Sequence, residues 1–176
     1  MAYDFKKMAR KAVDNSPGLT TQAWMAPLRT FLEVAKPTNA GVTPGDSILI
    51  DGDHTFDIAD GFIPIYATQD TASIGTETTG EMDSRGSNKT GEFFYPGINA
   101  ESIEFMENAK NENWVILFEN LDEKLFQMGS KMLPAEVVGS LQTGTLGSDK
   151  KGIIFTVNNF GPLYIYEGVV TEKPEV

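Results

Sequence analysis

The sequence contains no cysteine and only one histidine, His54, among its 176 residues. The absence of cysteine excludes disulfides and thiolate chemistry. A single histidine also excludes zinc sites built from several histidines and cysteines, and no HExxH motif occurs. The GxxxxGK[ST] phosphate loop and the GxSxG nucleophile motif are missing as well. We therefore expect a protein that is not an enzyme and that holds no cofactor or metal.

Positive charge is scarce, because 14 Lys and Arg residues face 25 Asp and Glu residues, for a formal net charge of −11. This balance argues against nucleic-acid binding through phosphate neutralisation, which needs cations. Hydrophobic residues make up 40% of the chain, enough for one core. No apolar run matches a signal peptide or a transmembrane span. We expect a soluble chain, made in the cytoplasm, without membrane insertion.

His54 lies in the stretch DGDHTF, beside Asp51 and Asp53. Asp-Gly-Asp is the ordinary composition of a hairpin turn. The same residues also allow a metal site or an acid–base pair, although the alternating acceptors and late Glu of an EF-hand loop are missing. The turn is the simpler interpretation, and we expect no metal or catalytic role.

The N-terminal segment 4–15 has the spacing of an amphipathic helix. It holds four of the 14 cations of the chain. Its apolar positions are Phe5, Met8, Ala9, Ala12 and Val13, and the cations between them are Lys6, Lys7, Arg10 and Lys11. The polar face is either simply solvated or docks on an acidic neighbouring subunit. The stretch NSPGLT (15–20) then breaks the helix, so that 1–20 forms an arm.

The first half of the remaining chain indicates strands separated by turns. Residues 28–35 fit either a helix or a strand, and we favour the strand because β-like sequence follows. The stretch 47–56 predicts a hairpin around an Asp-Gly turn. The stretch 61–68 predicts a strand, in which Pro64 implies a sheet edge or a bulge.

The stretch 69–91 is rich in Thr, Ser and Gly and poor in large apolar side chains. It is too long and too polar for a core element. We expect a long loop, or an extended hairpin whose tip is ordered by a partner. Long segments of this kind are commonly functional.

Residues 99–110 predict the clearest helix. Asn99 is a suitable N-cap, and Glu101 and Glu104 lie near the positive end of the helix dipole. One face is apolar, with Ile103, Phe105, Met106 and Ala109. A helix with one apolar face covers another element, here most simply a sheet.

The second half of the chain is otherwise β. The run 113–120 is continuously apolar and suits a strand buried on both faces, with Trp114 in the core. A hairpin partner at 123–130 and further strands at 134–145, 152–160 and 162–168 complete a meander. Tyr164 and Tyr166 share one strand face, which serves either as an interface or as packing under the helix. The tail 169–176 is expected to fray or to reach outward.

These elements predict a mainly β fold with one or two helices: a β-sandwich or open barrel of antiparallel strands flanked by an α-helix. The expected organisation is an arm (1–20), a single β-sandwich domain (21–168) and a C-terminal tail (169–176). The domain would carry the long loop 69–91 and the helix 99–110.

The order of these elements resembles the tail tube proteins of long-tailed bacteriophages. The resemblance covers residues 92–168 and, less specifically, DHTF…GF…Y at 53–66. It rests on these stretches, in order: NAESIEFMENAKNENWVILFEN, DEKLFQMGS, LPAEVVGSLQTGTLGSDKKGIIFTV and GPLYIYEG. These are turn and strand patterns, without a catalytic residue among them. The basic N-terminal helix has no counterpart in the family pattern.

The resemblance implies a structural protein of the virion tail, assembled in the host cytoplasm. Its subunits would form stacked hexameric rings with sheets joined edge to edge. The partners would be other copies, other tail proteins and double-stranded DNA in transit through an acidic lumen. Contacts between subunits would involve the arm and the segment 69–91, represented by Phe5, Met8, Lys11, Asp70, Ile74, Glu77, Glu81, Arg85 and Asn88.

Two other functions remain open at this point. A tail terminator, connector or baseplate ring would share the same fold. A non-viral ligand-binding sandwich or small enzyme would instead be a monomer with a pocket around Tyr164, Tyr166 and His54.

Overall fold

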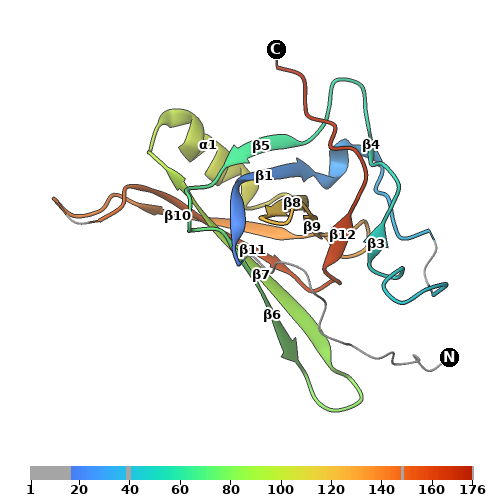
Figure 1. Cartoon of the computed structure of the whole chain (residues 1–176). Coiled ribbons are helices and arrows are strands. Elements are labelled where there is room, and N and C mark those ends of the chain that lie inside the picture. Colours follow the sequence, from blue (N-terminus) through green and yellow to red (C-terminus); the bar gives the residue numbers. More distant parts are fainter. Residues whose placement is uncertain (1–16, 39–40, 148, 176) are drawn as a thin grey trace.

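The computed structural model describes residues 17–38, 41–147 and 149–175 (Figure 1). It is a sandwich of two sheets. The larger sheet has the strand order β3 (Leu49–Ile50), β12 (Tyr164–Tyr166), β9 (Leu125–Met128), β8 (Trp114–Asn120), β1 (Leu19–Pro27) and β5 (Ile63–Tyr66). The smaller sheet has the order β10 (Glu136–Gln142), β11 (Gly152–Asn159), β7 (Gly86–Pro96) and β6 (Ser73–Thr79). The expected mainly β fold with one flanking helix is confirmed.

Two short strands and two helical segments complete the described chain. The strands β2 (Phe31–Glu33) and β4 (Thr55–Phe56) pair with each other in an antiparallel manner. A 3₁₀ turn, η1 (Leu28–Thr30), connects β1 to β2, and α1 (Ala100–Ala109) follows β7. For residues 28–35 the favoured strand therefore forms only in part, after a helical turn.

The core has two layers, one on each face of the six-stranded sheet. Strand β8 shows this clearly, since all residues from Trp114 to Phe118 are buried. Trp114, Ile116 and Phe118 face the layer between the two sheets. Val115 and Leu117 face a second layer, which β2, β4 and their loops cover. The prediction of a strand buried on both faces is thus confirmed, and the six-stranded sheet has no open face at its centre.

Helix α1 closes one side of the layer between the sheets. Asn99 accepts a hydrogen bond from the backbone N–H of Ser102, whose hydroxyl accepts one from the backbone N–H of Asn99. This capping box fixes the start of the helix. The ring of Phe105 then packs against those of Trp114 and Phe155, with centroids 6.0 and 5.9 Å away. The expected helix and its cap are confirmed.

Two expectations about connectivity are wrong. No hairpin forms at 47–56, because β3 pairs in parallel with β12, whereas β4 pairs with β2. The strands after β9 do not continue one meander, because β10 and β11 join the other sheet and β12 returns to lie beside β9. Both errors have the same cause. Each strand pairs with a strand that is distant in the sequence, and local turn residues do not indicate which distant strand that is.

Both ends of the domain contain more regular structure than we expected from the sequence. Strand β1 begins at Leu19, within the segment expected to be an arm, and lies between β8 and β5 in the larger sheet. The tail is held rather than frayed, because the backbone of Phe62 donates to Thr171 and accepts from Lys173. Trp24 reinforces this contact by donating from Nε1 to Glu172 at 2.8 Å.

Gly129 provides a test of this packing. Its φ is +97°, and a Cβ there would lie 2.4 Å from the carbonyl oxygen of Trp114. We expect Gly129→Ala to lower the free energy of unfolding by at least about 3 kcal/mol, because strain and a backbone clash combine. Gly97 has a φ of +89° with nothing within 4 Å, so Gly97→Ala is the matched control with strain alone, about 1 kcal/mol. Equal losses in urea unfolding would contradict the role assigned to the clash.

Candidate functional site

The four-stranded sheet has one buried face and one open face. Its inward side chains, among them Phe93, Phe155 and Val157, belong to the core between the sheets. Register and alternation place the following residues on the other face: Ser73, Gly75, Glu77 and Thr79 of β6; Gly86, Asn88, Thr90, Glu92, Phe94 and Pro96 of β7; Gly152, Ile154, Thr156 and Asn158 of β11; and Glu136, Val138, Ser140 and Gln142 of β10. Part of this face is covered near Phe94, which is 7% exposed and has the ammonium of Lys150 5.8 Å from its ring centroid. No described helix or strand forms a layer over the rest of the face, and its outward strand residues include three carboxylates and no lysine or arginine.

Both edges of this sheet are unpaired among the described residues, because no further strand joins β6 or β10. Each neighbouring pair in the sheet is antiparallel. Strands β6 and β10 therefore run in opposite directions. A second copy related by rotation could add its β10 to β6 with antiparallel pairing, which is the geometry already used throughout the sheet.

The larger sheet is less open at its edges. Pro64 lies in the edge strand β5 and has no N–H to donate, as expected from the sequence. Next to it, Phe62 forms a bridge with Glu172 of the tail. At the other edge, β3 is only two residues long. Short, proline-containing and covered edges resist strand addition, so the two sheets differ in their capacity to join another chain.

The segment 69–91 forms an extended hairpin, which was one of its two expected forms. Strand β6 pairs with the first part of β7, from Thr79 opposite Gly86 to Ser73 opposite Glu92. The tip between the strands projects away from the body of the molecule (Figure 1). Its backbone is closed by a hydrogen bond from Ser84 N–H to the carbonyl oxygen of Glu81.

The structure groups most of the predicted contact residues on this hairpin. Glu77 and Asn88 are cross-strand partners, and Glu81 and Arg85 lie exposed at the tip. Ile74 differs, because its side chain packs inward against the core. Asp70 lies in the turn before β6, with a φ of +63°. Phe5, Met8 and Lys11, with the expected helix that contains them, lie outside the described residues.

The two open edges are staggered along the strand direction. The middle of β6, Thr76, lies opposite Lys89. The middle of β10, Gly139, lies opposite Phe155 of β11, which lies opposite Phe93. Lys89 and Phe93 are four residues apart on β7. This offset could not be found in the sequence, because it depends on the register of three strand pairs.

His54 is a buried core residue and not part of an exposed turn. Only 3% of it is exposed, and its ring stacks on Tyr166 with centroids 4.5 Å apart. Nδ1 accepts from the backbone N–H of Ala35, so the neutral ring donates from Nε2 to Gln127 Oε1, both at 2.9 Å. Burial lowers the pKa of His54, and this effect exceeds the opposing effects of Gln127 and Asp53.

Tyr166 and His54 do not line an open pocket, because both side chains are buried. Tyr166 is buried, and its hydroxyl accepts from the backbone N–H of His54 and donates to the carbonyl oxygen of Val169. Burial raises the pKa of this phenol. Tyr164 packs against the same outer core layer, on the face of the larger sheet away from α1. Of the two alternatives that the sequence left open for these tyrosines, packing under the helix is therefore wrong.

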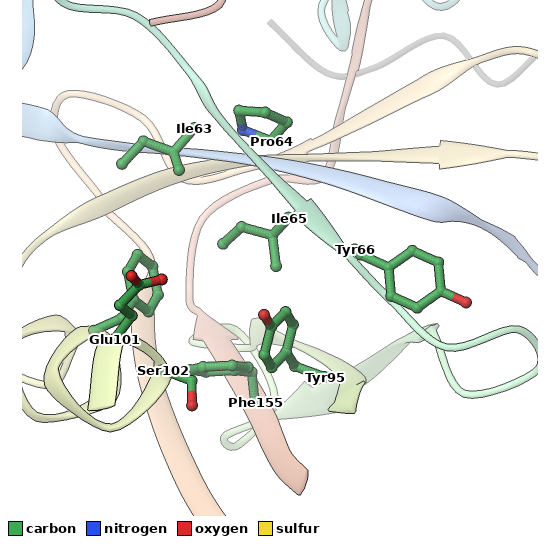
Figure 2. A pocket seen from close by; sticks show the side chains of 9 residues that line it. Ile63, Pro64, Ile65, Tyr66, Tyr95, Glu101, Ser102 and Phe155 are labelled. Carbon is green, nitrogen blue, oxygen red and sulfur yellow. The ribbon is translucent and has the colours of Figure 1, made fainter. Parts of the chain in front are cut away.

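An apolar groove lies between α1 and β5 (Figure 2). Its volume is about 220 Å³. Figure 2 shows Ile63, Ile65, Tyr95 and Phe155 directed into it, with Glu101 and Ser102 of α1 on its side. A second hollow continues along the helix and shares Ile63, Glu101 and Phe105. We call this continuous feature the α1–β5 groove.

Within the part of the chain that the structure describes, no group of three or more His, Asp or Glu side chains is arranged to hold a metal ion. The described residues also include no helix with the length and apolar character needed to cross a membrane. Comparisons with protein-family models, with curated proteins and with solved structures give no match to this chain. Its function therefore has to be argued from its own surfaces.

The environment of His54 predicts a pH-dependent stability. A lowered pKa in the folded state means that the unfolded chain binds more protons just below pH 6.5, the ordinary histidine value. The free energy of unfolding should therefore be highest above pH 6.5 and fall as the pH decreases below it. Thermal unfolding from pH 7.5 to 5.5 checks this.

The control is His54→Phe, which should be less stable throughout but should lose the histidine part of the slope. Because the chain has one histidine, its imidazole proton resonance reports the folded-state pKa directly. A midpoint at or above 6.5 would contradict this interpretation.

Proposed function

We propose that this chain is a structural tail tube subunit of a long-tailed bacteriophage, located in the virion tail and without catalytic activity. Copies would close into hexameric rings that stack around a channel for DNA. The observation that carries the proposal is the four-stranded sheet, which has one mostly polar face outside the core and two unpaired edges of opposite direction among the described residues. The ring size is taken from the family resemblance of the sequence.

Edge pairing between copies would produce one closed barrel. Six sheets of four strands would give 24 strands, all antiparallel, if β6 of each copy pairs with β10 of the next. A closed barrel needs a stagger between its edges, and this sheet has one. If the middle of β6 pairs with the middle of β10 of the next copy, each copy contributes a stagger of four residues, about 13 Å along the strands, over four strand spacings, about 19 Å across them. The resulting strand tilt is about 35°, within the range of natural barrels.

The open face of the sheet would line the channel. The alternative orientation would place the larger sheet inside, but that sheet is covered on both faces by core layers. Each copy would then present Glu77, Glu92 and Glu136 to the channel. Carboxylates repel the phosphates of DNA, so a duplex would find no site at which to bind during passage.

The β6–β7 hairpin would make the contact between rings. It continues β6 and β7 beyond the level at which β11 ends, opposite Lys89. In a barrel it would therefore project past one rim of its ring. Its exposed tip contains Met82, a large apolar side chain that is 73% exposed. A neighbouring ring would cover it.

The central test is the assembly state of the purified chain. We expect a solution mass of six copies or multiples, and rings or tubes in negative-stain microscopy. A clean monomer at high protein concentration would contradict the proposal.

Edge pairing is tested with Gly75→Pro and Thr76→Pro. Adjacent residues of a strand point their N–H groups to opposite sides. One of these substitutions therefore removes an N–H that points to β7, and the other removes an N–H that points to the open edge. The proline at the open edge should leave a folded monomer with a native circular dichroism spectrum. Normal rings from both variants would exclude β6 as the joining edge.

Stacking is tested by replacing the tip, Gly80–Arg85, with Asn-Gly, a turn that suits a two-residue hairpin. Strands β6 and β7 retain their pairing, so we expect rings to form and tubes to be lost. Met82→Ser is the milder control, expected to shorten tubes. Tubes of normal length from the shortened hairpin, measured by microscopy, would remove its assigned role.

A further inference from the structure

The α1–β5 groove is the one apolar surface in the described residues for which the chain itself offers a fitting occupant. Its floor consists of Ile63, Ile65 and Phe155 (Figure 2). Phe105 of α1 also lines it. Tyr66, at one end, is 49% exposed. At about 220 Å³, the hollow in Figure 2 is smaller than the usual small-molecule pocket but continues into a second hollow along the helix. An elongated apolar groove suits a peptide segment better than a compact ligand.

The occupant is not an added strand. Pro64 interrupts the hydrogen-bonding edge of β5, so this edge cannot support a regular ladder. The alternative mode of peptide recognition in a groove is an amphipathic helix that buries its apolar face.

The side of the groove is acidic. Glu101 and Glu104 of α1 line it, and neither forms an ion pair with any described residue. The other acids nearby are already engaged: Glu107 pairs with Lys110, and Glu112 pairs with Arg29. An occupant with cations beside its apolar face would complement the two unpaired carboxylates.

We propose that the α1–β5 groove binds the N-terminal segment 4–13 of a second copy of this chain. This segment combines an apolar stripe, which includes Phe5 and Met8, with four cations. As a helix its ten residues would be about 15 Å long, the same length as α1, which lines the groove. The stripe fills the groove and the cations face Glu101 and Glu104.

The direction in which the chain enters the domain favours a second copy over the same copy. Gly18 lies beside Leu121, and Leu19 pairs with Asn120 at the end of β8. The pairing of β1 with β5 begins only at Gln22, opposite Tyr66, and proceeds toward Pro27. The groove therefore extends away from the chain end. A segment that filled its own groove would have to reverse direction within a few residues of Gly18, and this favours the groove of a second copy.

This inference rests on the self-assembly part of the proposed function, and it adds a contact that sheet pairing does not provide. An arm exchanged between copies raises the effective concentration of each partner for the other. It would hold copies together while sheet edges join.

Disulfide trapping tests the contact in the full-length protein, because the chain has no cysteine of its own. Chains with Met8→Cys are mixed with chains with Tyr66→Cys and oxidised. The matched control replaces Tyr66→Cys by Ile58→Cys, an exposed apolar site elsewhere that is 94% exposed. We expect at least about tenfold more crosslinked dimer with Tyr66→Cys than with the control. Equal yields would overturn the proposal.

A single chain with both Met8→Cys and Tyr66→Cys identifies the source of the segment. Crosslinks between chains support exchange, whereas a disulfide closed within monomers at high dilution would overturn it. The outcome is separable from the tube proposal: hexamers without the specific crosslink would refute only the arm contact. Specific crosslinked dimers without rings would refute only the tube.

The acidic side of the groove provides a second, independent readout. Glu101→Gln with Glu104→Gln should lower the yield of the Met8–Tyr66 crosslink several-fold, and added salt should lower it in the parent pair. Glu33→Gln with Glu167→Gln removes the same charge from exposed positions away from the groove and should leave the yield unchanged. Equal effects of the two double variants would show that net charge, rather than this groove, controls the contact.

Discussion

The unequal burial of the two sheets is the constraint on which the rest of the structure depends. Hydrophobic burial supplies the main driving force for folding, and here it is used on both faces of the larger sheet but on one face of the smaller sheet. The larger sheet therefore serves as the framework: β8 at its centre contributes side chains to both core layers. The smaller sheet is left with a mostly polar outer face and with two edges that no described strand covers, and open edges can pair with another chain.

Local chemistry predicted the elements whose neighbours lie close in sequence. The capped helix α1, the continuously apolar β8 and the β8–β9 hairpin follow from capping, hydrophobicity and a short turn. Pro64 likewise indicated a sheet edge. Strand β1 was not found, because its first half, LTTQ, is polar and its burial begins only at Ala23. The pairing of β3 with β12 joins segments more than a hundred residues apart, and no local signal selects that partner.

The candidate site could be predicted only in outline. The polar composition of 69–91 indicated a segment unsuited to a core. The pairing of Glu77 with Asn88 within it is known only from the structure. The open face and the stagger arise from the register of several strands, which is a property of the assembled sheet. His54 shows the converse, because DGDHTF has the composition of a turn and yet the imidazole ring is buried. Ala35 and Gln127 form hydrogen bonds with its two nitrogens, and Tyr166 stacks on one face of the ring. A lone polar residue becomes inexpensive to bury when its partners come from distant strands.

The four-residue stagger has a consequence for size. For a given number of strands, tilt sets the radius of a closed cylinder, since inclined strands occupy more of the circumference than upright ones. Twenty-four strands inclined by about 35° would place opposing backbones roughly 45 Å apart. Side chains would narrow that span, yet the remaining aperture would admit a double helix with its hydration layer. In the proposed tube, a slip of β6 by two residues along β7 would change this stagger, and the diameter of the channel would change with it.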